Sequence, residues 1–201
     1  MDDPEIAWLN TQVLAARQGS DEAFELLVDK YQKPVYNLCY RMLGDPAEAE
    51  DAAQESFWRA YQSLKKYDPQ RPFATWLLAI SAHYCIDLIR KRRMVVLPMD
   101  ILREEDAPDL TPGPETRFLQ GEERVAIQNL LSNLNSQDRA AVIMRYWYEF
   151  SYEEIAEALS LSVSAVKSRL HRSRIELAEL WQTKQINHTK AARSQYESPA
   201  L

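Results

Sequence analysis

The amino-acid sequence predicts an all-α protein with two small helical domains. Only 4 of the 201 residues are glycine, whereas Ala, Leu, Glu and Arg are abundant, and this balance favours helices over turn-rich β architectures. Apolar residues recur with the helical period of about 3.6 residues through most of the chain. One acidic, proline-rich stretch interrupts this period, so we expect a linker between two domains.

The domain boundaries follow from this pattern. We expect the first domain at 1–93, a flexible linker at 94–120, the second domain at 121–182 and a mobile tail at 183–201. The interruption in the linker comes from four prolines and a cluster of acids. The prolines are Pro98, Pro108, Pro112 and Pro114.

Two helices are predicted before residue 45. The first begins at Pro4, a favoured residue for the first helical turn, and ends near Gln18. The second begins at Asp21, is kinked by Pro34, and closes at Gly44, where glycine permits a left-handed end.

A third helix begins at Asp45-Pro46-Ala47-Glu48, because this segment combines an N-cap, a first-turn proline and a glutamate three residues after the cap. Its expected buried side is Ala49, Ala53, Phe57, Ala60 and Leu64. A second side carries Asp51, Gln54 and Glu55 beside Trp58 and Arg59. From the residues alone, this acidic surface could be a metal site, an acid–base pair, a protein interface or a solvated surface.

A fourth helix at 73–93 combines aromatic residues with a basic end. The aromatics are Phe73, Trp76 and Tyr84, and the basic run is Arg90, Lys91, Arg92 and Arg93. Opened DNA requires stacking surface for its bases and cations for its backbone, so this helix is a candidate nucleic-acid contact. Aromatic residues at helical spacing are more often core, so the basic run is the better candidate.

In the second domain, residues 151–180 have the organisation of a helix-turn-helix. Ser151 and Glu154 form a capping box, a tight turn follows at 160–162, and a longer helix runs from Val163 to about Trp181. We expect Val166, Leu170, Ile175 and Leu177 to face inward. An outward row suited to a major groove consists of Ser164, Lys167, Ser168, His171 and Arg172. The competing interpretation is a solvated surface on an ordinary helical hairpin.

The distribution of charge supports a nucleic-acid contact although the total does not. A net charge of −6 disfavours phosphate binding, but the basic residues gather at 90–93 and 167–174, and the acids at 45–55 and 103–109. This segregation predicts two basic surfaces and a separate acidic one.

Other functional classes lack their sequence signals. The three histidines are far apart, and no phosphate loop, HExxH or GxSxG motif is present, so we expect no catalysis, no metal and no cofactor. Cys39 and Cys85 lie inside apolar patterns and are expected to be buried thiols in a reducing cytosol. No leader or membrane span is visible, which predicts a cytoplasmic protein without membrane insertion.

Four segments in this order and spacing resemble the extracytoplasmic-function (ECF) sigma factors of the sigma-70 family over residues 20–181. They are DEAFELLVDKYQKPVYNLCYRML, DPAEAEDAAQESFWRAYQSL, RPFATWLLAISAHYCIDLIRKRR and SYEEIAEALSLSVSAVKSRLHRSRIEL. The resemblance implies two helical domains, called regions two and four, in a non-catalytic polymerase subunit. The implied partners are core RNA polymerase, through the clamp coiled coil of its large subunit and its flap, promoter DNA and a separate anti-sigma factor.

The resemblance also assigns residue roles. It implies polymerase binding by Asp51, Gln54 and Glu55. It implies minus-ten binding by Trp76, His83, Arg90, Lys91, Arg92 and Arg93, and minus-thirty-five binding by Ser164, Lys167, Ser168, His171 and Arg172. Two positions depart from the family pattern: position 83 is His where Asn is common, and the turn at 159–162 lacks the frequent Gly. The first departure bears on minus-ten specificity.

The alternative function is a stand-alone helix-turn-helix transcription regulator with an N-terminal sensor domain. Such a sensor would not be expected to carry the acidic motif of the third helix. It would also not be expected to end in Phe73 and Trp76 followed by a basic run. These features favour the sigma-factor interpretation.

Overall fold

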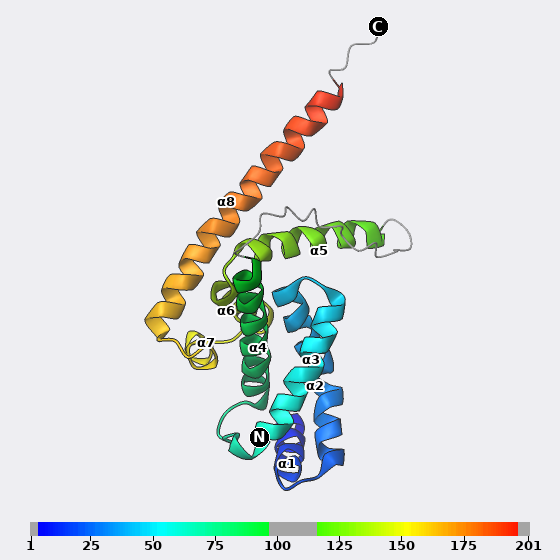
Figure 1. Ribbon diagram of the computed structural model, residues 1–201, viewed down its shortest axis with the longest axis vertical. Coiled ribbons are helices and arrows are strands. Elements are labelled where there is room, and N and C mark those ends of the chain that lie inside the picture. The colour runs from blue at the N-terminus through cyan, green and yellow to red at the C-terminus, as the bar shows by residue number, and fades with distance from the viewer. Residues whose placement is uncertain (1–3, 97–115, 197–201) are drawn as a thin grey trace.

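A computed structural model describes residues 4–96 and 116–196, with side chains described at 4–93 and 124–183. Within these ranges the chain is helical and contains no strand, which confirms the all-α prediction. The N-terminal domain contains α1 (Pro4–Arg17), α2 (Asp21–Leu43), α3 (Pro46–Ser63), the 3-10 turn η1 (Leu64–Lys66) and α4 (Phe73–Val96). The C-terminal domain contains α5 (Thr116–Asn133), α6 (Ser136–Trp147), α7 (Tyr152–Ala158) and α8 (Val163–Tyr196), as Figure 1 shows.

The helix boundaries of the N-terminal domain follow local capping signals. The Ser20 hydroxyl accepts from the Ala23 amide at the start of α2, and the Asp45 carboxylate accepts from the Glu48 amide, 2.8 Å away, at the start of α3. Gly44 closes α2 with a φ of 87°, a left-handed conformation that glycine adopts without a steric penalty. The predicted starts and stops are therefore confirmed.

The core of the N-terminal domain lies between α2, α3 and α4, with α1 covering α2. Its fully buried side chains include Leu27, Leu38, Met42 and Leu77. The free thiols Cys39 and Cys85 are also buried here, and a hydrogen bond with Cys39 together with burial raises the pKa of Cys85. Both cysteines therefore act as small apolar residues of the core.

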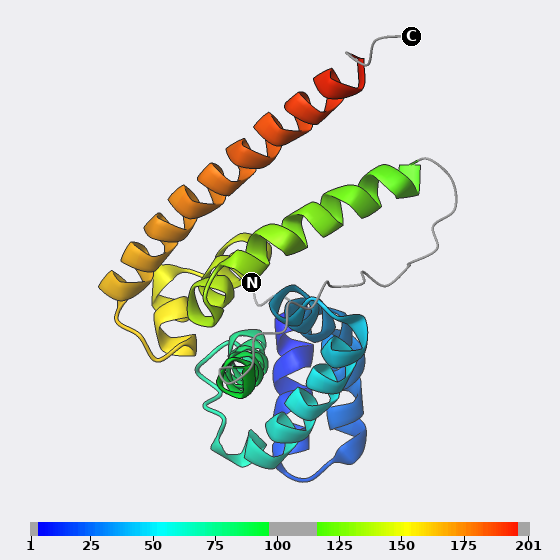
Figure 2. The same ribbon diagram turned by 45° about the horizontal axis from the view of Figure 1, so that its top comes forward.

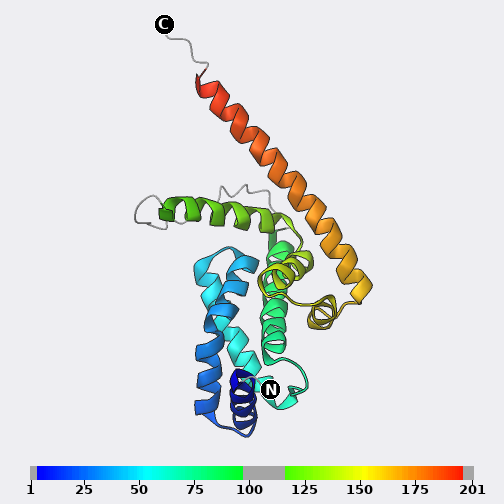
Figure 3. The same ribbon diagram turned by 180° about the vertical axis from the view of Figure 1, so that it is seen from behind.

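The C-terminal domain has a smaller core. Leu131 of α5, Ile143 and Met144 of α6, Ile155 of α7 and Val166 of α8 are all buried. Because α8 packs against the other three helices only along its first turns, the rest of this helix projects beyond them (Figure 3).

Some predicted helix ends were wrong. The last helix extends past Trp181 to Tyr196, so residues 183–196 of the expected tail are helical, because this segment contains no Gly or Pro that would end a helix. Likewise, 94–96 complete α4, and 116–120 begin α5 two residues after Pro114, the last linker proline. The remaining linker prediction, at 97–115, lies outside the described residues.

Two apolar residues that fit the helical period are not core residues. Ile6 in α1 is 56% exposed and Ile175 in α8 is 48% exposed. Each lies at a point where the helix has no neighbour on that side, so periodicity alone overestimated the buried surface.

The two domains pack against each other. Helix α4 contacts α6 and α7 as well as α2 and α3, and α2 also contacts α5 and α6. In the view of Figure 2, α4 lies between the α1–α3 helices and the C-terminal domain. The first helix of the helix-turn-helix is thereby placed beside the start of α4.

Candidate nucleic-acid and protein interfaces

The helix-turn-helix consists of α7, the turn at 159–162 and α8. The Ser151 hydroxyl accepts from the Glu154 amide at 3.1 Å, and the Glu154 carboxylate accepts from the Ser151 amide at 2.8 Å. This predicted capping box is confirmed, and the bond from the Ser151 amide lowers the pKa of Glu154. The charged form of Glu154 thus helps to fix the start of α7.

The turn between the two helices is formed without glycine. Ser160 adopts a left-handed conformation with a φ of 54°, and the Leu161 amide donates to the Ala156 carbonyl at 2.8 Å. Ser162 then caps α8 by accepting from the Ala165 amide at 3.2 Å. Ser160 therefore takes the left-handed position of a turn that lacks glycine.

One face of α8 gathers the five predicted minus-thirty-five residues. All five side chains, those of Ser164, Lys167, Ser168, His171 and Arg172, are exposed. Val166 and Leu170 on the opposite face are buried, so packing fixes the direction in which the five point. This face offers hydroxyl, imidazole, ammonium and guanidinium groups, which are the donors and acceptors suited to base edges and phosphates.

Arg169 belongs to the same basic cluster in sequence but has a different environment. Its guanidinium donates to the Asp138 carboxylate at 2.5 Å and to the Gln137 side chain at 3.0 Å, and its side chain is largely covered. It therefore joins α8 to α6. The sequence placed Arg169 among the cations but gave no signal of this partner.

The candidate minus-ten residues are distributed along α4. Trp76 is half-buried in an aromatic cluster with Tyr67 and Phe73, at centroid distances of 5.0 and 5.6 Å. His83 is exposed, with its Nδ1 atom 3.0 Å from the Ala79 carbonyl oxygen. Residues that are seven apart on a helix lie on nearly the same side, because seven residues complete almost two turns. Trp76, His83 and Arg90 therefore form one row.

The basic end of α4 is only partly free. Arg90, Lys91, Arg92 and Arg93 are all exposed, and Arg92 also forms a surface ion pair with Glu48 of α3. The structure thus distinguishes one cation that has a partner on a neighbouring helix from the other three of the same sequence run.

On α3, Asp51 and Gln54 are exposed, and Glu55 pairs with Arg59 at 2.7 Å. The Arg59 guanidinium lies 4.4 Å from the centre of the Tyr84 ring. Beside this surface is a hollow of about 530 Å³ between α2 and α3. Its lining residues are Val28, Gln32, Lys33, Tyr36, Glu50, Ala53, Gln54 and Phe57.

An aromatic pair continues the same face of α3. Trp58, three residues after Glu55, is 56% exposed, and its ring stacks on Tyr61 at a centroid distance of 6.1 Å. The Tyr61 hydroxyl donates to Asp21 at 2.7 Å, which holds the pair in place. The helical spacing from Asp51 through Glu55 to Trp58 is the sequence signal that would have added Trp58 to the candidates.

The three surfaces remain distinct. The α3 and α4 residues lie on the N-terminal domain and the α8 residues on the C-terminal domain, so they do not converge on one active site. Within the residues that the structure describes, no group of three or more His, Cys, Asp or Glu side chains could hold a metal ion. None of the described helices is long and apolar enough to cross a membrane.

Both halves of this architecture match family models. Residues 27–94 match the model described as sigma-70 region 2, and residues 124–177 match the model described as sigma-70, region 4. Together with the helix-turn-helix, these matches define a sigma-70-type transcription initiation factor. The match of the N-terminal domain removes the alternative of a stand-alone regulator with a sensor domain.

Curated relatives narrow the class further. The chain is 35% identical to the ECF RNA polymerase sigma factor SigW of Bacillus subtilis, over 83% of this chain and 92% of the relative. It is 32% identical to the ECF RNA polymerase sigma-E factor of Haemophilus influenzae, over 83% of this chain and 92% of the relative. The chain belongs to the ECF RNA polymerase sigma factors, alternative sigma factors that direct transcription initiation.

Solved structures share the fold. A structure of CnrH in complex with the cytosolic domain of CnrY matches with a TM-score of 0.66 and 23% identity, covering 88% of this chain and 98% of that one. The sigma factor RpoE in complex with the anti-sigma factor NepR from Bartonella quintana matches with a TM-score of 0.60 and 21% identity, covering 79% of this chain and 96% of that one.

Proposed function

We propose that the three surfaces divide the work of promoter recognition. The α3 face formed by Asp51, Gln54, Glu55 and Trp58 docks on core RNA polymerase, the α4 row contacts the minus-ten element, and the exposed face of α8 contacts the minus-thirty-five element. The corresponding domains are 1–93 and 121–182, joined by the segment at 94–120. The observation that carries this proposal is the exposed five-residue row on the recognition helix α8, which Ser162 caps, in a chain that also matches sigma-70 region 2.

The α8 face has the chemistry for base readout. Arg172 can donate two hydrogen bonds to the major-groove edge of a guanine, whereas Lys167 carries a more flexible point charge. The Lys167 ammonium lies 5.6 Å from the centre of the Tyr152 ring, which restrains it near the start of the groove-facing row. We assign a base contact to Arg172, whereas Lys167 contacts either a phosphate or a base.

On α4, exposed His83 stands between the Trp76 cluster and the free cations Arg90, Lys91 and Arg93. An imidazole can stack on an unpaired base or form a hydrogen bond with it. We assign His83 to the melted minus-ten strand and the cations to its phosphates. Trp76 contributes an edge of an already packed aromatic cluster.

The chain itself performs no bond-breaking chemistry in this proposal and acts in the cytoplasm, where polymerase and promoter DNA are found. Its regulation comes from a separate anti-sigma protein, as in the complex of RpoE with NepR. The polymerase contacts are the clamp coiled coil of the large subunit for α3 and the flap for the C-terminal domain.

The polymerase assignment is tested by Asp51→Ala combined with Glu55→Ala. Hydrogen bonds to charged groups contribute about 1.5–3 kcal/mol, so the double variant should weaken core binding at least about tenfold in a fluorescence titration. The matched control is Glu25→Ala with Asp29→Ala, an exposed acidic pair with the same spacing of four residues on α2. Equal affinities of the two double variants, with helicity intact by circular dichroism, would remove the assignment.

A further inference from the structure

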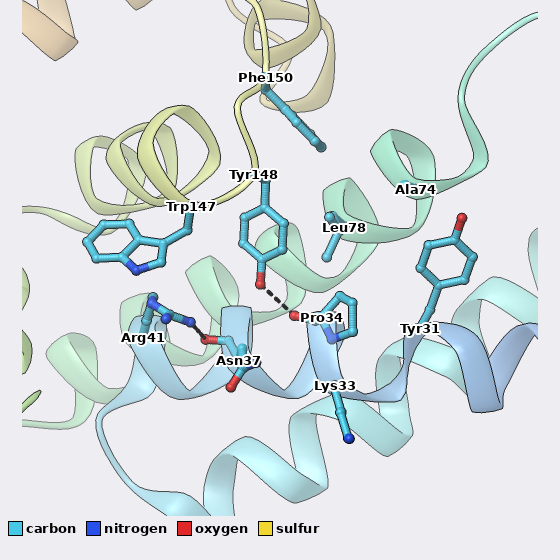
Figure 4. Close-up of a pocket in the computed structure, with 10 residues that line it drawn as sticks. All are labelled: Tyr31, Lys33, Pro34, Asn37, Arg41, Ala74, Leu78, Trp147, Tyr148 and Phe150. Atoms are coloured by element: carbon cyan, nitrogen blue, oxygen red, sulfur yellow. Dashed lines mark hydrogen bonds between the residues drawn. The ribbon is translucent and has the colours of Figure 1, made fainter. Parts of the chain in front are cut away.

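Arg41, near the end of α2, is a cation that neighbouring helices partly cover. Its side chain is partly buried, and its guanidinium lies 5.0 Å from the centre of the Trp147 ring of α6. Figure 4 shows the guanidinium below this ring, where it donates to the Asn37 carbonyl, 3.1 Å away. This is the only hydrogen bond of the guanidinium to the residues that the structure describes, so most of its N–H groups are available to another acceptor.

A second guanidinium lines the same space. Arg124 of α5 is exposed, and its guanidinium lies 4.7 Å from the centre of the Tyr40 ring of α2. Burial lowers the pKa of Arg41, and the positive charge of Arg124 lowers it further. Among the ion pairs between described residues, none includes Arg41 or Arg124. The two like charges therefore lack a carboxylate that would balance them.

The space that these two side chains line is a cavity of about 350 Å³ between α2, α5 and α6. It adjoins the cavity of about 420 Å³ in Figure 4, with which it shares Asn37, Arg41 and Trp147. Small-molecule sites typically have volumes of about 300–1,000 Å³ and combine apolar walls with a few polar groups. The remaining lining residues are Tyr40, Ile127 and Gln128, so both kinds of surface are present and no acidic side chain is among them.

The charge of this lining favours an anion, and the geometry of a guanidinium favours a phosphate. A guanidinium presents its donors in a planar fork that matches two phosphate oxygens at once, and such charged hydrogen bonds are stronger than neutral ones. A phosphate monoester carries a charge of about −1.5 to −2 at neutral pH, which matches two arginines. A carboxylate carries a single charge and matches the pair less well. The rings and Ile127 offer apolar surface to the rest of an organic molecule.

We propose that the cavity lined by Arg41 and Arg124 binds a small organic phosphate, a monoester whose charge the two guanidiniums balance. The Gln128 amide nitrogen donates to the Arg41 carbonyl at 3.2 Å, which leaves the amide oxygen to accept from a hydroxyl group of the ligand. A phosphate of a nucleic-acid backbone is a diester with one charge, so it matches the pair less well than a monoester. The site shares no residue with the three surfaces of the proposed function and does not depend on their roles.

The test is isothermal titration calorimetry of the full chain with three monoesters: AMP, ribose 5-phosphate and glycerol 3-phosphate. At least one ester should bind with a Kd below about 1 mM, and the same molecule without its phosphate should bind at least about tenfold more weakly. Thermal unfolding at constant ionic strength gives a second readout, because a ligand of the folded chain stabilises it. At ten times its Kd, the ester should raise the Tm by about 3–6 °C.

Variants locate the binding in this cavity. Arg41→Gln combined with Arg124→Gln should weaken binding of the ester at least about tenfold, because both charged donors are lost. Arg124→Gln alone, at an exposed position, should weaken it at least about threefold and serves where the Arg41 substitution disturbs folding. Arg41→Lys with Arg124→Lys keeps the charges without the fork and should lose part of the affinity. The control is Lys65→Gln with Lys66→Gln, which removes two exposed cations of η1.

Three results would each overturn the proposal. They are a Kd above about 1 mM for all three esters, equal binding of an ester and its dephosphorylated form, and equal binding by the arginine variants and the lysine control. A short single-stranded DNA tests the other source of phosphate. If the arginine substitutions weaken binding of this DNA more than binding of the esters, the phosphate belongs to nucleic acid and the small-ligand assignment is wrong. The effect of Asp51→Ala with Glu55→Ala on core binding is measured separately, so each proposal can fail alone.

Discussion

The two long helices that carry the candidate DNA contacts, α4 and α8, differ in how much of their surface is packed. Helix α4 has neighbours in both domains, and buried residues such as Leu77, Ala82 and Cys85 line it through several turns. Helix α8 is packed mainly along its first turns, at Val166, Leu170 and Ser173. One long helix, α4, therefore serves as a core element, and the other, α8, serves as a projecting element.

This difference changes how the substitution of a candidate DNA-contacting residue should be interpreted in each helix. In α4, Arg92 is tied to Glu48 and Trp76 belongs to an aromatic cluster, so substitutions there alter folding and binding together. In α8, the row from Ser164 to Arg172 is exposed on a helix whose opposite face is fixed by packing. Substitutions in that row should change DNA binding without changing the stability of the fold.

The largest expected effect is on the packed side of α4. Leu77 is fully buried, and Leu77→Ala should lower the free energy of unfolding by about 2–5 kcal/mol, because it removes apolar contacts and leaves a cavity. Urea denaturation followed by circular dichroism measures this loss. On the exposed side of the same helix, His83→Ala should change stability by less than about 0.5 kcal/mol. Similar losses for both variants would mean that α4 is not packed as described.

On α8, Arg172→Ala should cost about 1–3 kcal/mol of binding at the correct minus-thirty-five sequence and much less at a scrambled one. The measurement is a titration of holoenzyme on matched and scrambled promoters. Arg174→Ala is the control, since Arg174 is an exposed cation of the same helix outside the row. If Arg172→Ala weakens binding to both promoters equally, Arg172 contacts only the backbone.

Salt dependence sharpens the assignment of Lys167. A residue that contacts only phosphate weakens all sequences alike when it is removed, and it lowers the slope of log affinity against log salt by about 1. Lys167→Ala should therefore be titrated at two or more salt concentrations on both promoters. An unchanged slope with a loss confined to the matched promoter would place Lys167 on a base.

A smaller effect on affinity, but a change of specificity, is expected at His83. His83→Asn replaces an imidazole by an amide with a different pattern of donors and acceptors, so the preferred bases of the opened strand should change. A promoter library selected with parent and variant holoenzymes measures this change, and core binding serves as the control. Identical base preferences would make His83 a surface residue without a role in recognition.

The smallest expected effect is at the turn of the helix-turn-helix. Ser160→Gly relieves a left-handed conformation that costs about 1–2 kcal/mol, but it adds freedom to the unfolded chain worth about 0.4–1 kcal/mol. Stability should rise by no more than about 1.6 kcal/mol, with promoter binding unchanged. Ser160→Val, in contrast, should be clearly destabilising in the same thermal unfolding assay. Equal stability of the Gly and Val variants would contradict the left-handed turn.

Sequence patterns located most helices because their ends are fixed by nearby residues. The caps at Ser151 and Asp45 act within three residues, and the left-handed end at Gly44 depends on its own backbone. The same local patterns placed the five α8 residues on one exposed face. The same patterns did not predict the helix at 183–196, because this segment lacks an apolar period. The segment is helical because it contains no residue that would end a helix.

What the sequence by itself determined about this protein is its all-α class, the helix-turn-helix and the family to which it belongs. Only the tertiary structure decided which cations have partners on other helices, as Arg92, Arg139 and Arg169 do. It also decided that the domains meet, through contacts such as that of Tyr148 with Pro34, 114 residues away in the chain. Local signals act over one or two helical turns, whereas such pairings depend on how complete helices pack.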